Sequence, residues 1–346
     1  MEKIRLGKTG LQITRLGFGG IPIQRLSDED AVAVVKRCLD LGVAFLDTAN
    51  AYTTSEGRIG QAIAGRRRED LVIATKSQAR DRDGVVKHLQ LSLERLGVTY
   101  IDLYQFHQVS DQKNLEAILA PNGPLAAVQK AIQDGRVRHV GLTSHSMDTA
   151  KEAIKTGRFE TVMFPFNFIA NEPAQELIPL AREHDVGFIA MKPMGGGLLE
   201  NATVAFKYLM QFPDIALIPG IEKLHEIEEI AAIMTGPSEM TEAERLTMQR
   251  LKDELGTRFC RRCDYCQPCT EDIAISTVMV LRSFAKRFPP HRFFTERFSS
   301  VIEKATECSD CGECETRCPF HLPIREMMSE QIEWYQDEYR KHRALG

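Results

Sequence analysis

Short apolar runs alternate with longer amphipathic segments over the first two thirds of the chain. Eight apolar runs end in polar residues, at 15–20, 43–49, 71–77, 101–107, 138–144, 161–167, 186–192 and 215–220. Helical patterns lie between them at 28–41, 83–96, 125–134, 147–156, 173–184, 201–211 and 222–234. Apolar strands that alternate with helices form a parallel sheet covered by helices. Eight such units within roughly 200 residues favour a closed (β/α)8 TIM barrel of the α/β class over an open sheet.

The alternation stops near residue 235, where a Pro/Ser break is followed by a helical pattern. Thr241 and Glu244 have the spacing of a capping box at the start of that helix. We therefore expect a barrel over 1–235, and a small α-helical domain over 236–346 that comprises a helical linker, a cysteine-rich part and a C-terminal helix at 323–343. Residues 4–17 are predicted to form a hairpin around Thr9–Gly10 that covers the bottom of the barrel.

Composition narrows the possible partners and compartment. The net charge is -4 and no basic stripe stands out, so no nucleic-acid partner is expected. No stretch approaches the ~20 apolar residues of a membrane span, and the N-terminus lacks the apolar core of a signal peptide. We therefore expect a cytoplasmic protein without a membrane partner. Cys38 is predicted to be a buried small hydrophobe, whereas the other eight cysteines cluster after residue 259 and indicate metal binding.

Polar residues follow the predicted strands, and in a barrel these strand ends form the functional face. They are Asp47, Lys76, His107, Thr143, Ser144, Asn167 and Lys192, with Tyr52 in the loop after the second strand.

Four of these residues suit the reduction of a carbonyl group. A tyrosine hydroxyl such as that of Tyr52 can donate a proton to the reduced oxygen, but its ordinary pKa of about 10 makes it slow near neutral pH. An ammonium such as that of Lys76 stabilises the phenolate, and a carboxylate such as that of Asp47 fixes the ammonium. His107 can orient the substrate oxygen. Each residue alone has a structural alternative: a helix cap, a solvated lysine or a buried structural histidine.

The segments "FLDTANAYTTSEGRIGQAI", "LVIATKS", "SLERLGVTYIDLYQFH" and "VGLTSHS" resemble the aldo-keto reductase family over residues 4–234. The resemblance implies a (β/α)8 barrel that reduces a small-molecule aldehyde or ketone with NAD(P)H and without a metal in the barrel. It implies that Tyr52 is the general acid, that Lys76 and Asp47 tune it, and that His107 positions the carbonyl oxygen.

The predicted nicotinamide site departs from the family pattern. Thr143 and Ser144 stand where the family has Ser-Asn, and Met163 replaces a glutamine that contacts the carboxamide. Met191 stands where the family has an aromatic residue, and Lys192 beside it is a candidate charge partner for cofactor or substrate. Asn167 is a further candidate cofactor contact.

The predicted phosphate site departs as well. Gly220 and Glu226 occupy the places of a Lys and an Arg that favour NADP in many members, while Glu229 keeps an acidic position. A carboxylate there can accept hydrogen bonds from a ribose hydroxyl, so the sequence leans toward NADH. Lys223 lies nearby and opposes this preference.

Two runs of four cysteines follow the barrel. They are Cys260, Cys263, Cys266 and Cys269, then Cys308, Cys311, Cys314 and Cys318. The second run matches C-x2-C-x2-C-x3-C-P, in which three thiolates hold one [4Fe–4S] cluster and the fourth ligates its neighbour. We predict two clusters with exchanged fourth ligands, Cys318 with the first three cysteines and Cys269 with the second three. A single cluster and a four-thiolate zinc site are the alternatives. The whole chain thus resembles a branch of aldo-keto reductases with a C-terminal ferredoxin-like domain.

Three functions are compatible with these patterns. The first is a nicotinamide-dependent carbonyl reductase whose clusters are structural or accessory. The second is an electron-transfer enzyme that couples the clusters to the barrel or to a redox partner protein. Hydride carries two electrons and each cluster carries one, so a flavin would be expected between them, and the sequence has no flavin signature. The third is a non-catalytic sensor that retains the barrel.

Overall fold

The computed structural model describes residues 1–345, with side chains up to residue 343. The chain divides into two compact units, Met1–Thr241 and Glu242–Gly346. The boundary expected near residue 235 lies between the last helix of the first unit and the first helix of the second.

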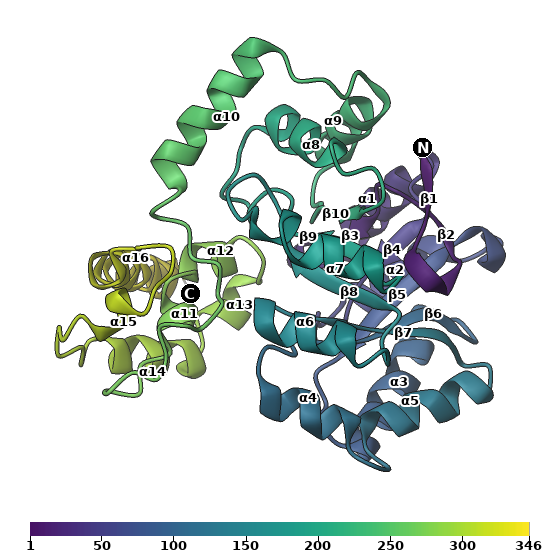
Figure 1. The fold of residues 1–346 in the computed structure, drawn as a ribbon, viewed down its shortest axis with the longest axis horizontal. Helices are drawn as coiled ribbons and strands as arrows, with labels where there is room; N and C mark the ends of the chain where they lie inside the picture. Colours follow the sequence, from purple (N-terminus) through teal and green to yellow (C-terminus); the bar gives the residue numbers. More distant parts are fainter. Residues whose placement is uncertain (346) are drawn as a thin grey trace. The chain divides into compact units, whose positions relative to one another are not determined.

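The first unit is a barrel of parallel strands with helices around it (Figure 1). The strands are hydrogen-bonded in sequence order from β3 to β10, and parallel bridges between Leu16 and Leu217 and between Gly19 and Gly220 bring the two edges together. The predicted eight-stranded barrel is therefore confirmed. Its strands are β3 Phe18–Gly19, β4 Phe45–Asp47, β5 Val72–Ser77, β6 Ile101–Phe106, β7 Val137–Thr143, β8 Thr161–Pro165, β9 Gly187–Met191 and β10 Ala216–Ile218.

The helices of this unit follow the predicted pattern with two additions, α2 and α4. The buried face of α2 includes Glu56 and Arg58, so its apolar periodicity is masked in the sequence. The bounds are α1 Asp28–Asp40, α2 Ser55–Ile63, α3 Arg82–Leu96, α4 Gln112–Leu119, α5 Pro124–Gln133, α6 Met147–Lys155, α7 Leu177–Glu183, α8 Ala202–Met210 and α9 Leu224–Thr235. Short 3-10 turns occur at Gly7–Thr9, Pro22–Arg25, Arg68–Asp70 and Glu172–Ala174.

Helix α1 shows how local sequence sets these elements. The Ser27 hydroxyl accepts a hydrogen bond from the Asp30 backbone N–H, which caps the first turn. Its buried residues recur at helical spacing and include Val34, Val35 and Cys38. Cys38 is fully buried, as predicted, and this burial raises the pKa of its thiol to about 12.

The N-terminal hairpin forms as predicted and packs against the barrel interior. Strand β1 (Lys3–Arg5) pairs with β2 (Gln12–Thr14), and the turn uses Gly10 at φ 70°, in the left-handed region that glycine tolerates. Leu6 and Ile13 are buried in one cluster with interior strand residues such as Phe45. Burying a side chain of this size is worth about 1.5–3 kcal/mol, so the hairpin closes this end and leaves the other for chemistry.

The second unit is all-helical with its own apolar core. Its helices are α10 Glu242–Leu255, α11 Ile275–Val278, α12 Leu281–Ala285, α13 Pro290–Phe293, α14 Glu296–Ala305, α15 Glu313–Thr316 and α16 Ile324–Leu345. The pattern of 275–288 predicts one helix, but the structure has two short helices there, because the chain breaks between α11 and α12. The predicted C-terminal helix is present, and Tyr335 is buried against Phe293 with ring centroids 5.4 Å apart. Helix α16 therefore packs on the core of its own unit.

Among the described residues, no helix combines the length and the apolar character needed to cross a membrane.

Candidate functional site

The four predicted catalytic residues lie at or just beyond the carboxyl ends of three neighbouring strands. Asp47 is the last residue of β4, Lys76 lies near the end of β5, and His107 directly follows β6. Tyr52 lies in the turn after β4, where its backbone N–H donates to Ala49 and its carbonyl accepts from Ser55. Parallel pairing of β4, β5 and β6 thus carries residues far apart in sequence to one end of the barrel.

A buried ion pair joins Lys76 and Asp47. The Lys76 Nζ donates to Asp47 Oδ1 at 2.5 Å and to the Thr48 carbonyl at 2.7 Å, and both charged side chains are almost fully buried. Burial raises the pKa of Asp47, while the charge and hydrogen bond of Lys76 and a hydrogen bond from Gln105 act against the rise. The ammonium is therefore held in one place by fixed acceptors, which suits a group that must stabilise a phenolate.

The Tyr52 ring lies near both an ammonium and an imidazole. Lys76 Nζ is 5.2 Å from the ring centroid. The His107 ring meets the Tyr52 ring edge-on, with centroids 5.6 Å apart and an interplanar angle of 80°. His107 is buried and Tyr52 is half-buried. The structure thus brings all four predicted residues together.

Two supporting residues were missed from the sequence. Gln105, fully buried in β6, donates from Nε2 to Asp47 Oδ2 at 3.1 Å. Arg80 donates to the backbone carbonyl of His107 at 2.6 Å and to that of Gln108 at 3.1 Å, which fixes the loop behind the imidazole. A polar residue inside the apolar run "IDLYQFH" was the available signal for Gln105, whereas nothing in the sequence marks Arg80.

Thr143 and Ser144, predicted to contact the cofactor, are buried at the end of β7. The Thr143 Oγ1 accepts from the Gln108 backbone N–H at 2.8 Å, which leaves its hydroxyl proton to donate elsewhere. Ser144 Oγ donates to the Ser146 carbonyl and accepts from the Ser146 N–H. Met163, at the position of the family glutamine, is buried among the interior side chains. Thr143 is therefore the better donor of this group.

Asn167 and Lys192 lie at the ends of the next two strands and contact each other. Asn167 Nδ2 donates to the Lys192 carbonyl at 3.1 Å, and its Oδ1 accepts from the Ile169 and Ala170 backbone N–H groups. Lys192 Nζ lies 2.9 Å from Nε2 of His145, a buried residue that sequence reasoning did not single out.

Gly220 and Glu229 lie at the predicted phosphate end. Gly220 follows β10 closely, and a Cβ there would come within 2.7 Å of Pro22. Glu229 is exposed on α9. Between them, Glu226 Oε2 accepts from the backbone N–H groups of Glu222 and Lys223 at 2.9 and 3.0 Å. A carboxylate of the chain itself therefore caps this helix N-terminus.

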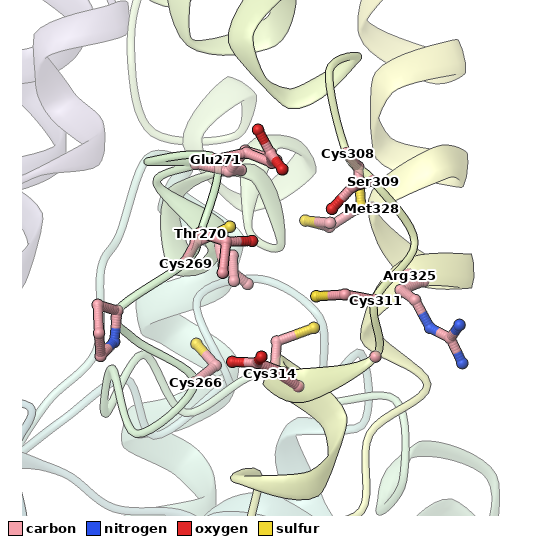
Figure 2. Close-up of a pocket in the computed structure, with 15 residues that line it drawn as sticks. Cys266, Cys269, Thr270, Glu271, Cys308, Ser309, Cys311, Cys314, Arg325 and Met328 are labelled. Carbon is pink, nitrogen blue, oxygen red and sulfur yellow. The ribbon is translucent and has the colours of Figure 1, made fainter.

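The second unit contains two cavities lined by cysteines. One is lined by Cys266, Cys269, Cys308, Cys311 and Cys314. The other is lined by Cys260, Cys263, Cys266 and Cys318. In Figure 2, Cys266 and Cys269 face Cys311 and Cys314 across the first cavity, and the Met328 thioether lies near Cys308. Cys266 lines both cavities; if it is assigned to the second, each cavity has the four cysteines that the sequence predicts for clusters with exchanged fourth ligands.

The backbone beside the cysteines has the same form in both runs. Arg262 and Asp264, which flank Cys263, have φ of 61° and 62°. Asp310 and Gly312, which flank Cys311, have φ of 58° and 76°. Backbone that alternates between right- and left-handed conformations turns N–H groups into a concavity that binds anions, including iron–sulfur clusters. Both runs thus have residues of positive φ on each side of their second cysteine, a feature that such concavities share.

Burial favours the protonated form of three of these thiols. Burial raises the pKa of Cys266 to about 12 and also raises the pKa of Cys263 and of Cys314. Iron must therefore displace protons from these thiols on binding. Within residues 1–345 no three His, Cys, Asp or Glu side chains converge as they would around one metal ion.

Known proteins resemble this chain both in the barrel and in the cysteine-rich part of the second unit. A model of the aldo/keto reductase family matches residues 15–204, more than half of the chain, and a 4Fe-4S dicluster domain model matches residues 259–323. The protein named "Probable aldo-keto reductase 1" from Glycine max is 28% identical over 215 residues, which cover 57% of this chain and 60% of that protein. An uncharacterized oxidoreductase from Bacillus subtilis is 30% identical over 213 residues, which cover 58% of this chain and 67% of that protein.

A solved structure has the same fold. It is an aldo/keto reductase from Klebsiella pneumoniae in complex with NADP and acetate, with a TM-score of 0.61 and 19% identity over 72% of this chain and 95% of that one. The chain described here therefore belongs to the aldo/keto reductase family and carries a C-terminal 4Fe-4S dicluster domain.

Proposed function

We propose that the barrel reduces a small-molecule aldehyde or ketone to an alcohol with NAD(P)H. The observation that carries this proposal is the buried Lys76–Asp47 pair, whose ammonium lies 5.2 Å from the centre of the Tyr52 ring. Bringing two charges out of water costs several kcal/mol per ion. Removing one partner of a buried pair destabilises the fold by about 3–5 kcal/mol, because the remaining charge is left uncompensated. Such a pair beside a half-buried phenol is well explained if the phenol must ionise.

The residues at the nicotinamide end fit a carboxamide. Thr143 Oγ1 accepts a hydrogen bond from the Gln108 N–H, and its own hydroxyl proton can be donated to a carboxamide. Asn167 Nδ2 uses one of its two hydrogens to bond the Lys192 carbonyl, and the second can also be donated. The Klebsiella relative binds NADP, which supports a nicotinamide cofactor for this barrel. When bound, NAD(P)H would supply hydride to the carbonyl carbon.

The phosphate end fits a ribose hydroxyl better than a 2′-phosphate. The Glu226 carboxylate accepts hydrogen bonds from the Glu222 and Lys223 backbone N–H groups before α9. These donors could otherwise bind a phosphate. Arg25, the nearby guanidinium, is paired with Glu222 at 3.3 Å. We therefore propose NADH as the preferred cofactor, with Gly220, Glu229 and Lys192 retained as predicted cofactor contacts.

The chain's own groups have distinct roles in the proposed reaction. His107 donates a hydrogen bond to the substrate carbonyl oxygen and so fixes its position. Tyr52 transfers its hydroxyl proton to that oxygen as negative charge develops on it. Lys76 stabilises the resulting phenolate, and Asp47, held by Gln105, keeps Lys76 in place. Together these groups supply the proton at a pH at which an ordinary tyrosine is a weak acid.

We propose that the second unit holds two [4Fe–4S] clusters. Cys260, Cys263, Cys266 and Cys318 would hold one, and Cys269, Cys308, Cys311 and Cys314 the other.

The proposed role of these clusters is accessory or structural. A second role, electron transfer to a redox partner protein, is favoured by two observations. Cys266 and Ile275 line both cavities, so the two clusters would be adjacent. Cys308 and Cys311 are exposed, so one cluster would lie near the surface.

Replacing Tyr52 by phenylalanine tests the reductase proposal. Tyr52→Phe removes the proton donor and is expected to lower kcat for an aldehyde by about 10²–10⁴-fold, while NADH binding is retained. Steady-state kinetics and quenching of NADH fluorescence measure the two effects. Tyr100→Phe is the matched control, because Tyr100 precedes the opposite end of β6, where its ring lies between Arg68 and Arg138. Undiminished turnover by Tyr52→Phe would remove Tyr52 from the acid role.

A further inference from the structure

One guanidinium joins the carboxyl ends of β5 and β6. Arg80 lies three residues beyond β5, and each of its five N–H groups has an acceptor within the barrel. Its Nε donates to Asn114 Oδ1 on α4 at 2.8 Å. Nη1 and Nη2 donate to four backbone carbonyls, those of Gln78 at 3.1 Å, Ala79 at 3.3 Å, His107 at 2.6 Å and Gln108 at 3.1 Å. The donors of Arg80 are thus fully used in holding the chain itself.

These bonds continue the connection between the two strands past their last backbone hydrogen bond. The strand pairing ends at Ser77 and Phe106, and the His107 N–H donates to the Ser77 carbonyl at 2.8 Å. Beyond this bond the carbonyls of the two loops cannot bond each other, because a carbonyl only accepts. The planar fork of a guanidinium presents its donors in a fixed geometry, so Arg80 holds carbonyls of both loops at set positions.

The residue after His107 has a backbone conformation that needs such support. Gln108 has a φ of 58°, in the left-handed region, which costs a non-glycine residue about 1–3 kcal/mol. Its carbonyl accepts from Arg80, its N–H donates to Thr143 Oγ1 at 2.8 Å, and its Oε1 accepts from Gln78 Nε2 at 3.1 Å. Conformations of this kind persist where the surrounding bonds over-determine them, and they cluster at functional sites. The loop that begins with His107 is therefore held from β5 and from β7.

We propose that Arg80 is a positioning residue of the barrel site, which fixes the His107 imidazole through the backbone carbonyl of His107. This inference rests on the proposed reductase function. The His107 ring meets the Tyr52 ring with centroids 5.6 Å apart, so a shift of the His107 backbone changes the spacing between the proposed carbonyl-positioning group and the proposed proton donor. A misplacement of about 1 Å caused by a residue away from the chemistry can lower a rate by about 100-fold.

Arg80→Met tests this role against a matched control, Arg68→Met. Arg68 joins the opposite ends of the same two strands, where it donates to the carbonyls of Leu71 at 2.9 Å and Tyr100 at 3.0 Å. Both variants lose bonds to carbonyls, so both should unfold at lower urea concentration than the wild type. Only Arg80→Met is expected to lower kcat for an aldehyde, by about 10- to 100-fold, with an unchanged KM for NADH. If Arg80→Met does not fold, Arg80→Lys and Arg68→Lys give the same comparison, because an ammonium lacks the fork.

Rescue by a small molecule separates positioning from general loss of stability. Guanidinium chloride, at concentrations well below those that unfold the protein, is expected to restore part of kcat in Arg80→Ala and none in Arg68→Ala. Equal losses of kcat in Arg80→Met and Arg68→Met overturn the proposal, as does an unchanged kcat in Arg80→Met.

A measurement without turnover reports on His107 directly. The full-length protein is labelled with carbon-13 at Cε1 of its nine histidines, and the His107 resonance is assigned from its absence in His107→Gln. We expect this resonance to shift in Arg80→Met and to stay in place in Arg68→Met. If the wild type reduces no aldehyde but the shift appears, the reductase function fails while the positioning of His107 by Arg80 stands. An unshifted His107 resonance in Arg80→Met contradicts the positioning role.

Discussion

At the residue scale, the buried charges of the barrel are its most consequential feature. Lys76 and Asp47 are 1% and 3% exposed at the side chain, and their bonds to Thr48 and Gln105 satisfy further polar atoms. A pair of this kind adds little stability compared with apolar residues of equal volume, but breaking it leaves an uncompensated charge. Its presence is better explained by chemistry than by folding.

Removing one partner should therefore cost more stability than removing both. We expect Asp47→Leu to lower the free energy of unfolding by about 3–5 kcal/mol, because the Lys76 ammonium stays buried without its carboxylate. The double variant Asp47→Leu/Lys76→Met should recover much of this loss. Urea unfolding followed by circular dichroism compares the two. A double variant as unstable as the single one would show that volume, and not charge, sets the cost.

The four catalytic candidates could be predicted because each follows a strand whose position the apolar pattern had already fixed. Gln105, Arg80 and His145 could not. Gln105 gains its role from Asp47 two strands away, and Arg80 from the backbone of His107. His145 contacts Lys192, 47 residues later in the chain. Contacts between residues so far apart in sequence depend on barrel closure and leave no local pattern.

At the element scale, ion pairs join neighbouring parts of the barrel, and one of them makes stability depend on pH. Arg182 on α7 donates two hydrogen bonds of 2.6 Å to Asp214, which precedes β10. The hydrogen bonds and charge of Arg182 lower the pKa of Asp214 in the folded state. A carboxylate with a lowered folded-state pKa stabilises the fold above its unfolded pKa of about 3.9 and loses that contribution as pH falls through the folded value.

Asp214→Asn should remove this contribution. Both side chains are about half exposed, so solvent screening limits the expected loss at pH 7 to under about 1 kcal/mol. The difference in unfolding free energy between wild type and Asp214→Asn should shrink as pH falls below 3.9 toward the folded-state pKa. Thermal unfolding across that range measures it. A difference that stays constant with pH would mean that the Asp214 charge plays no part.

Elements with clean periodicity were predictable and those with buried charges or breaks were not. Most strand residues are apolar, and helix α1 has a buried apolar face at helical spacing. Helix α2 hides Glu56 and Arg58 on its inner face, so the period is lost. In 275–288 no proline or glycine interrupts the helical pattern, yet the chain forms two short helices that both contribute to the core of the second unit. Periodicity alone does not show where tertiary packing interrupts a helix.

At the scale of the whole molecule, the two units have separate cores, so each is expected to respond to its own perturbations. The core of the second unit includes Cys318 and is lined by further cysteines, so cluster loss should loosen this unit first. Metal binding free energy contributes directly to folding where the site is not preformed in the unfolded chain.

We expect anaerobically purified protein to be brown and to contain acid-labile sulfide. Cys308→Ser/Cys311→Ser should lose iron and lose hydrogen-exchange protection in α14 and α16, while barrel strands stay protected and aldehyde reduction continues. A stable second unit with lost dye-coupled activity would instead support electron transfer. Cys38→Ala is the control, because Cys38 is buried in the barrel and its loss should leave the colour unchanged.

The aromatic packing of α16 has a practical consequence for following these events. Trp334 is the chain's one tryptophan, and its ring lies 6.2 Å from that of Phe293 in the core of the second unit. Tryptophan fluorescence therefore originates from the second unit alone. Cluster assembly and loss can be followed by the fluorescence of Trp334, without an added label and without a tryptophan signal from the barrel.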